Sequence, residues 1–151
     1  MEVFIMRHGE AEFMAAQDSQ RALSKHGIEQ SKLAGEKLNR CCPHFDIVAH
    51  SPYLRATQTW QHVNTKCNSV GKVYVLDELT PSGDIENLTA WLEELYIEDS
   101  QRSILLVSHL PLVSYLSQAL AKQDQAIAFH TANIARLRMT NTGVAQLLQF
   151  T

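Results

Sequence analysis

Short strand-like runs alternate with helix-like segments through most of this 151-residue chain. A strand that is followed by a helix and then by another strand builds a parallel sheet with helices packed on its faces. The sequence therefore predicts an α/β fold, a three-layer α/β/α sandwich around a mainly parallel sheet. The expected strands cover residues 3–6, 46–50, 73–76 and 104–107, and segments with helical spacing follow them.

Recognisable start signals mark most of the expected helices. Serine and aspartate are favoured at the N-cap, where the side chain accepts a hydrogen bond from a free backbone N–H, and proline is favoured at the first helical position. On this basis a first helix is capped by Ser24 and stops near Pro43. A second helix opens with Ser51-Pro52 and runs from Tyr53 towards Val70. A third helix is capped by Asp84, and a fourth follows Pro111.

The end of the chain breaks this alternation. Residues 134–139 alternate in polarity, residues 141–143 form a turn signal, and residues 144–150 are again strand-like. This pattern predicts an antiparallel pair of strands added to the parallel sheet. The chain has no repeat, no low-complexity stretch and no linker, so we expect a single domain over residues 1–151.

Composition excludes several classes of protein. The chain is 45% hydrophobic and 19% charged with a net charge of -3, which gives no electrostatic case for binding nucleic acid or an anionic membrane. No apolar stretch reaches the roughly 18 residues of a membrane span, and the N-terminus lacks the pattern of a signal peptide. The three cysteines are an odd number and include the adjacent pair Cys41 and Cys42, so we expect no disulfide framework and a cytoplasmic location. Together with His44 these two cysteines match no zinc-binding spacing, and no metal is expected.

Two arginines and two histidines lie where expected strands end. Arg7 and His8 follow the first strand, Arg55 lies in the first turn of the helix after the second, and His109 follows the fourth. Open α/β sheets bind ligands at the carboxyl ends of their strands. Arginine grips phosphate or carboxylate with two N–H groups, and histidine can act as a base, a ligand or a nucleophile. These residues predict an anion site at one edge of the sheet.

The same residues occur in recognisable motifs. Arg7-His8-Gly9, the segment Ser51–Thr59 with its Ser-Pro-x-x-Arg-Ala-x-Gln-Thr pattern, and Ser108-His109 resemble the motifs of the histidine phosphatase superfamily, the phosphoglycerate mutase-like enzymes. The resemblance runs essentially from end to end. Within the superfamily the chain is most similar to the small bacterial phosphohistidine phosphatases, in residues 3–9, 79–84 and 108–113.

The resemblance implies a role for each of these residues. His8 would be the nucleophile and would form a phosphohistidine intermediate that water then hydrolyses to release inorganic phosphate. Arg7 and Arg55 would bind the phosphoryl oxygens and stabilise the charge that grows in the transition state, with His109 as a further donor. No cofactor is implied, because arginine and histidine supply the positive charge.

Two further residues stay open at this point. Arg21 resembles a family position beside the phosphate pocket. Two alternatives stay open for it: contact with the substrate, or a place beside the pocket without such contact. Glu78 is the candidate general acid that would protonate a leaving alkoxide, or it is structural. Glu10 and Glu12 follow the nucleophile closely, and we expect them to point away from the phosphate or to orient a neighbour.

The expected substrate is a histidine-phosphorylated protein, either a phosphotransfer domain or a phosphocarrier. Residues 81–83 lead almost directly into the helix at Asp84, which leaves little chain for a lid, and an open site suits a phosphorylated side chain on another protein. One alternative is a phosphatase of small phosphomonoesters or sugar phosphates. Another is a non-enzymatic phospho-protein adaptor, although an adaptor has no need of His8. Nucleotide-binding glycine loops are absent.

Overall fold

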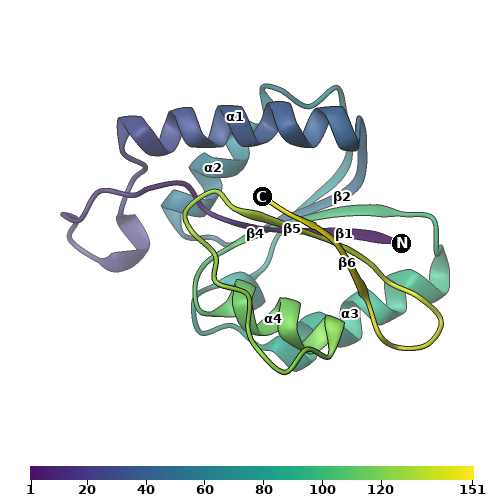
Figure 1. Cartoon of the computed structure of the whole chain (residues 1–151). Coiled ribbons are helices and arrows are strands. Elements are labelled where there is room, and N and C mark those ends of the chain that lie inside the picture. The colour runs from purple at the N-terminus through teal and green to yellow at the C-terminus, as the bar shows by residue number, and fades with distance from the viewer.

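A six-stranded sheet runs through the middle of the molecule, with helices on both faces (Figure 1). The computed structural model describes every residue from Met1 to Thr151. The strand order is β3-β2-β4-β1-β5-β6, with the first four strands parallel, β5 antiparallel to β1, and β6 antiparallel to β5. The predicted sandwich and its antiparallel C-terminal pair are therefore confirmed. The strands are β1 (Glu2–Arg7), β2 (His44–His50), β3 (Ser69–Val75), β4 (Ser103–Ser108), β5 (Ile134–Arg138) and β6 (Gln146–Phe150).

The helices form two layers, one on each face of the sheet. The pair α1 (Lys25–Cys41) and α2 (Leu54–Asn64) covers one face, and the pair α3 (Ile85–Glu98) and α4 (Leu112–Ala121) covers the other (Figure 1). Two short 3-10 turns, η1 (Asp18–Gln20) and η2 (Asp77–Leu79), complete the set. No helix has the length and apolar character that crossing a membrane requires.

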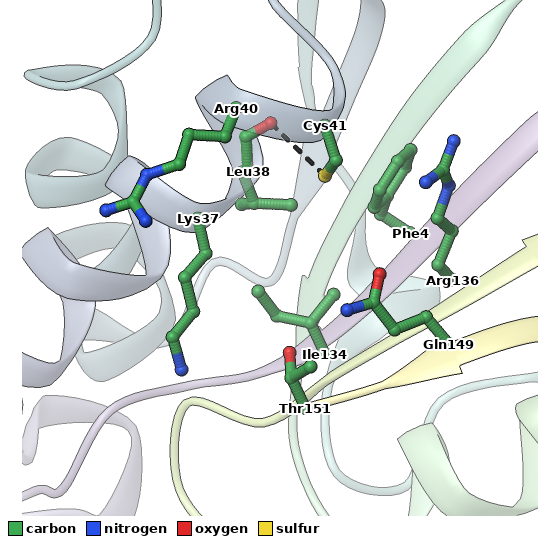
Figure 2. Close-up of a pocket in the computed structure, with 9 residues that line it drawn as sticks. All are labelled: Phe4, Lys37, Leu38, Arg40, Cys41, Ile134, Arg136, Gln149 and Thr151. Carbon is green, nitrogen blue, oxygen red and sulfur yellow. Dashed lines mark hydrogen bonds between the residues drawn. The ribbon is translucent and has the colours of Figure 1, made fainter.

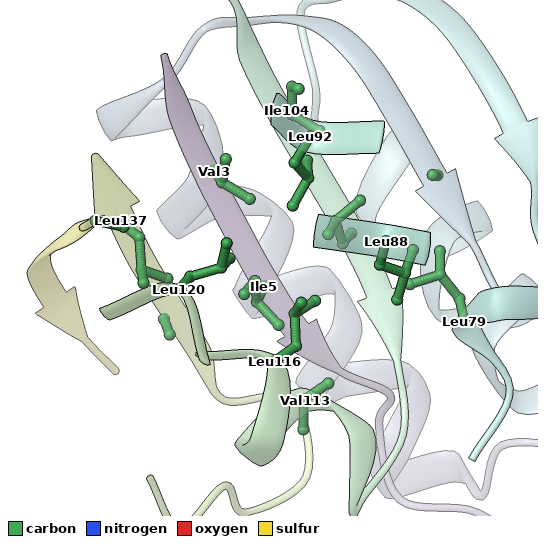
Figure 3. Close-up of a cluster of buried hydrophobic side chains, with 14 of the residues drawn as sticks. Val3, Ile5, Leu79, Leu88, Leu92, Ile104, Val113, Leu116, Leu120 and Leu137 are labelled. Carbon is green, nitrogen blue, oxygen red and sulfur yellow. The ribbon is translucent and has the colours of Figure 1, made fainter. Parts of the chain in front are cut away.

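Strand β1 contributes to both hydrophobic cores because its side chains alternate between the two faces. Val3 and Ile5 are fully buried in the core under α3 and α4 (Figure 3), whereas Phe4 and Met6 are buried in the core under α1 and α2. Burying one such side chain contributes about 1.5–3 kcal/mol to stability. Burial on both faces holds β1 at the centre of the sheet, so the residues that follow it have a well-defined position.

Two of the predicted helix caps are confirmed. Ser24 Oγ accepts the Gly27 N–H at 3.0 Å at the start of α1, and Asp84 Oδ1 accepts the Asn87 N–H at 3.0 Å at the start of α3. Such a cap satisfies one of the backbone donors that a helix end leaves free, and it contributes about 1 kcal/mol.

The prediction for the second helix was wrong at both ends. Tyr53 is the N-cap and α2 begins at Leu54, so Pro52 does not occupy the first helical position. No side chain caps α2; Ser51 Oγ accepts the N–H of Tyr53, one residue before the helix begins, and it also contacts His109. The helix ends at Asn64, and Val70 lies in β3, where the extended chain pairs with β2.

The carboxyl ends of three neighbouring strands lie level with one another. Arg7 at the end of β1 pairs with Ser108 at the end of β4, and His50 at the end of β2 pairs with Val107. The residues that follow these strands therefore leave the sheet side by side. This register brings the predicted site residues to one edge.

Candidate active site

The segment after β1 is held by close contact with α1 and α2. A Cβ atom on Gly9 would lie 2.6 Å from the Gly27 carbonyl oxygen, so only glycine lets α1 pass this close. The Gly9 N–H donates to Thr59 Oγ1 at 3.0 Å, and the Thr59 hydroxyl donates to the Arg55 carbonyl at 2.7 Å. These contacts connect the end of β1 to the first turns of α2, and so place His8 beside Arg55.

His8 is buried with a defined distribution of ring protons. Its Nδ1 lies 2.6 Å from the Gly9 carbonyl oxygen, and a carbonyl can only accept, so Nδ1 carries the proton and Nε2 the lone pair. Arg55 Nε donates to His8 Nε2 at 3.3 Å. Burial, and after it the charges of Arg55 and Arg7, lowers the pKa of His8 to about 4. The ring is therefore neutral at neutral pH, and Nε2 is available as a nucleophile.

Two arginines lie beside this ring. Arg55 is 4% exposed, and its Nη1 donates to the Asp18 carbonyl at 2.7 Å. Arg7 Nη1 donates to the Phe129 carbonyl at 3.0 Å. Burial, and after it the charge of Arg55, lowers the pKa of Arg7 below its ordinary value. The two cations are therefore close enough to repel each other, which favours an anion bound between them.

His109 lies next to His8. The two ring centroids are 5.1 Å apart, and His109 is 1% exposed. Burial, with the nearby His8 and Arg55, holds the pKa of His109 well below its ordinary value. The Nε2 atom of His109 lies 2.7 Å from Ser51 Oγ. Ser51 Oγ already accepts the Tyr53 N–H, and its own proton can be donated to His109 Nε2. His109 Nδ1 then carries the ring proton and is a donor.

Two buried side-chain nitrogen atoms in the molecule have no hydrogen-bond partner, and both belong to this site. They are Arg7 Nε and His109 Nδ1. An unpaired buried polar atom costs about 1–3 kcal/mol, so each of these two atoms requires a partner. Both residues line one pocket of about 540 Å³ together with His8, Arg21 and Arg55. An anion in this pocket would supply acceptors for donors that the protein leaves unpaired.

The structure brings together five of the six residues that the sequence singled out. Arg21 lines the pocket with the other four, and its Nε donates to the Glu12 carbonyl at 2.7 Å. Glu78 is the exception. Its side chain lines a separate hollow of about 140 Å³ with Leu76, Asn87, Leu88 and Trp91, and not the pocket of His8.

Three residues of the site had no role assigned from the sequence. Ser51 and Thr59 are part of the quoted motif, and their contacts with His109 and Gly9 explain why the motif contains hydroxyls there. Asp18 lies in the loop before α1, and its carboxylate contacts both Arg21 and Arg55. No sequence signal pointed to Asp18, because its partners Arg21 and Arg55 belong to different segments that only folding brings together.

A second pocket lies away from this edge, between α1 and the strands β5 and β6 (Figure 2). It measures about 260 Å³, and Arg136, one of its basic residues, pairs with Glu2 at 2.7 Å. No group of three or more histidine, cysteine, aspartate or glutamate side chains is placed to hold a metal ion. The second pocket contains none of the residues predicted from the sequence; it is lined by Phe4, Lys37, Leu38, Arg40, Cys41, Ile134, Arg136, Gln149 and Thr151.

Comparison with known proteins assigns the class that this fold and site define. A model of the histidine phosphatase superfamily (branch 1) matches residues 3–91, and the chain belongs to this superfamily. It is 39% identical over 143 residues to phosphohistidine phosphatase SixA of Escherichia coli (strain K12), which covers 95% of this chain and 88% of that protein. It is 36% identical to the SixA homolog of Haemophilus influenzae, over 91% of this chain and 87% of that protein.

A solved structure agrees with this assignment. The protein histidine phosphatase SixA complexed with tungstate superposes with a TM-score of 0.94 at 38% identity, over 100% of this chain and 96% of that chain. A phosphoserine phosphatase of Entamoeba histolytica superposes with a TM-score of 0.76 at 15% identity and shares the fold. The family resemblance in the sequence motifs is therefore confirmed.

Proposed function

We propose that this chain is a phosphohistidine phosphatase, which releases inorganic phosphate from histidine-phosphorylated proteins through a phosphohistidine intermediate on His8. The observation that carries the proposal is the His8 ring, whose unprotonated Nε2 accepts from Arg55 Nε in a pocket with two buried nitrogen atoms that have no partner. Its relatives that are 36–39% identical are named phosphohistidine phosphatases.

The reaction has two steps at one nitrogen atom. His8 Nε2 donates its lone pair to phosphorus, and the P–N bond of the substrate breaks with its electron pair returning to the substrate ring. The second nitrogen of that ring carries a proton, so the group that leaves is neutral imidazole. The Gly9 carbonyl, bonded to Nδ1–H, stabilises the positive charge that develops on the His8 ring. Water then attacks phosphorus, the bond to Nε2 breaks, and phosphate leaves with the oxygen of the water.

The donors around the ring stabilise the transition state. Arg55 Nε donates to His8 Nε2. Arg7 and His109 contribute the two buried nitrogen atoms that have no partner in the protein. All three can donate to the equatorial phosphoryl oxygens, where charge accumulates. Losing one such donor in other enzymes costs about 3–4 kcal/mol of transition-state stabilisation. Arg21, at the rim of the same pocket, is a fourth candidate donor.

Phosphohistidine is the substrate that this set of residues suits best. A phosphohistidine ring that is protonated on its second nitrogen leaves as neutral imidazole, whose conjugate acid has a pKa of about 6.5. It therefore requires far less help from a general acid than an alkoxide does. Glu78, the candidate acid, lines a separate hollow. Glu10 and Glu12 line the pocket of His8, but Glu10 Oε2 accepts the Ser24 hydroxyl at 2.6 Å. This placement supports a substrate with a good leaving group.

The surface around the pocket supports a protein as the carrier of the phosphohistidine. Phe13 lines the pocket and is 91% exposed, and the adjacent Met14 is 89% exposed. Leu110 lines the same pocket and is also exposed. A partner that inserts a phosphohistidine side chain would cover these apolar side chains, which contributes favourably to binding. A phosphotransfer domain or a phosphocarrier protein is the partner that we propose.

The cysteines support a cytoplasmic location for the reaction. Cys41, Cys42 and Cys67 are all free, and Cys41 is exposed. Burial raises the pKa of Cys67 to about 11, so this thiol is protonated at neutral pH. Unpaired thiols are typical of proteins that work in a reducing compartment.

The test measures release of inorganic phosphate from a histidine-phosphorylated carrier protein beside a panel of phosphomonoesters. His8→Ala should abolish turnover, and His26→Ala, which removes an exposed histidine outside the pocket, is the matched control. Turnover of the phosphohistidine protein that requires His8 supports the proposal. Turnover mainly of the esters would assign the chain to the phosphatases of small phosphomonoesters, and near wild-type turnover by His8→Ala would exclude His8 as the nucleophile.

A further inference from the structure

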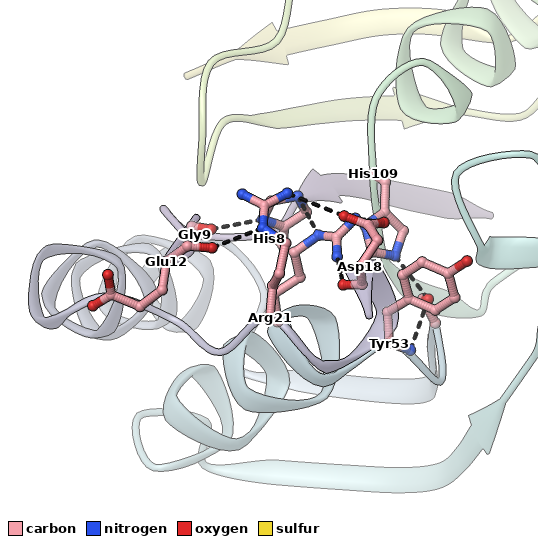
Figure 4. A network of polar contacts seen from close by, with 9 residues as sticks. His8, Gly9, Glu12, Asp18, Arg21, Tyr53 and His109 are labelled. Atoms are coloured by element: carbon pink, nitrogen blue, oxygen red, sulfur yellow. Dashed lines mark hydrogen bonds and ion pairs between the residues drawn. The ribbon is translucent and has the colours of Figure 1, made fainter. Parts of the chain in front are cut away.

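Asp18 is an exposed carboxylate whose two oxygens both contact arginines of the pocket (Figure 4). Oδ1 accepts from Arg21 Nη1 at 3.2 Å, and Oδ2 accepts from Arg55 Nη2 at 3.1 Å. The Asp18 side chain is 57% exposed, whereas that of Arg55 is 5% exposed. A negative charge at the surface is thus paired with the most deeply buried cation of the site.

The contact with Asp18 uses the edge of the Arg55 guanidinium that faces His8 Nε2. The N–H groups of Nε and Nη2 form one edge, and such an edge binds two oxygens of a phosphate at once. In Arg55 the Nε faces His8 Nε2 at 3.3 Å, and the Nη2 faces Asp18 Oδ2. A phosphoryl group at His8 Nε2 would bring its oxygens to this same edge. The carboxylate of Asp18 and the phosphoryl group therefore compete for Arg55 Nη2.

We propose that Asp18 is the internal counter-anion of this site, occupying the phosphate-binding edge of Arg55 before substrate binds and returning to it when phosphate leaves. Asp18 is a positioning residue, because it acts through Arg55 and Arg21 and not on the reacting atoms. Its carboxylate lowers the affinity of the site for free phosphate and so limits inhibition by the product. The inference rests on the proposed function for the identity of that product.

The surroundings of Asp18 allow both parts of this cycle. Burial would raise the pKa of Asp18, but hydrogen bonds from Arg21 and Arg55 outweigh it and hold that pKa below its ordinary value. The side chain is therefore anionic at neutral pH. Because it is largely exposed, water can solvate the carboxylate when a phosphoryl group displaces it. The backbone carbonyl of Asp18 accepts Arg55 Nη1 at 2.7 Å, so this contact can hold the arginine while the carboxylate is displaced.

The variant that tests this is Asp18→Asn, which removes the charge and preserves the shape and the backbone contact. Inorganic phosphate and tungstate are titrated into the full-length protein by calorimetry, and inhibition by phosphate is measured during turnover. A partly exposed ion pair is worth up to about 1 kcal/mol, so phosphate should bind about fivefold more tightly to the variant. The inhibition constant for phosphate should fall by the same factor.

Glu12→Gln is the matched control. Glu12 also lines the pocket, but Arg21 contacts its backbone carbonyl and not its carboxylate. This variant removes one negative charge near the pocket without removing an arginine contact, so its phosphate affinity should change much less than that of Asp18→Asn. Equal gains in both variants would reduce the effect to general electrostatics and overturn the specific role of Asp18. Unchanged or weaker phosphate binding by Asp18→Asn would overturn it as well.

A second measurement needs no variant and decides the matter if Asp18→Asn does not fold. The carboxyl carbon of Asp18 is followed by NMR as a function of pH, with and without inorganic phosphate. Displacement from the arginines should move the pKa of Asp18 back towards its ordinary value, and an unchanged pKa in the saturated complex would contradict displacement. If the proposed function fails, the unmodified enzyme will not hydrolyse phosphohistidine, a result that is independent of both phosphate-binding measurements.

Discussion

Acidification should destabilise this protein through His8 itself. Folding lowers the pKa of His8 from 6.5 to about 4, mainly by burial and then by the charges of Arg55 and Arg7. Between these two values the unfolded chain binds a proton that the folded chain does not, so the free energy of unfolding falls as the pH falls. Above pH 6.5 the ring is neutral in both states, and His8 contributes no pH dependence.

The size of the effect follows from the two pKa values. A decrease from 6.5 to about 4 corresponds to about 3 kcal/mol, lost in full once the pH is below the folded pKa. At about pH 5 the loss is about 2 kcal/mol. His8 is 7% exposed, so solvent screens this effect little.

The assay is urea unfolding of the wild type and of His8→Gln at neutral pH and at about pH 5. The other histidines are present in both proteins, so the difference in pH dependence reports the titration of His8 together with its charge interaction with His109. We expect the wild type to lose about 2 kcal/mol more than the variant on acidification. NMR titration of the His8 ring measures the pKa directly. Equal losses in the two proteins, with a His8 pKa near 6.5, would refute the argument that burial and the arginines keep Nε2 unprotonated.

Three further changes test other parts of the structure. Thr59→Val should lower the free energy of unfolding by about 1–3 kcal/mol in urea, because the Gly9 N–H loses its 3.0 Å acceptor; an unchanged value would show that this bond is replaced. Met14→Ser should raise KM several-fold for a histidine-phosphorylated protein in steady-state kinetics. The control Ile97→Ser removes an 82% exposed side chain near the end of α3 and should leave KM unchanged; equal effects would contradict the proposed contact surface. Glu78→Gln should slow hydrolysis of phosphomonoesters much more than that of phosphohistidine, and equal losses would contradict the leaving-group argument.

Most of the sheet could be predicted because its central strands are buried on both faces. Such strands appear in the sequence as continuous apolar runs, as in β1 and β4. Strand β3 lies at the edge of the sheet, and most of its residues are exposed, so it has no comparable apolar pattern. The sequence prediction therefore began this strand at residue 73 and extended the second helix over its first residues, including Val70.

The candidate site could be located for a related reason. Parallel strands place their carboxyl ends at one edge, so Arg7, His8, Arg55 and His109 were expected to meet once the strands were recognised. The structure brings these four together in one pocket. It also places Arg21 there, although its position in a long loop left the question open in the sequence.

The sequence alone determined the order and type of the main helices and strands and the residues that follow the strand ends. These properties depend on neighbours along the chain, through apolar periodicity, capping and turn signals. Tertiary structure alone decided that Glu78 lines a separate hollow, that His8 is held neutral, and that Asp18 is paired with two arginines of the site. Each of these depends on burial and on distances between residues far apart in the chain, because desolvation and charge act through space and local patterns do not encode them.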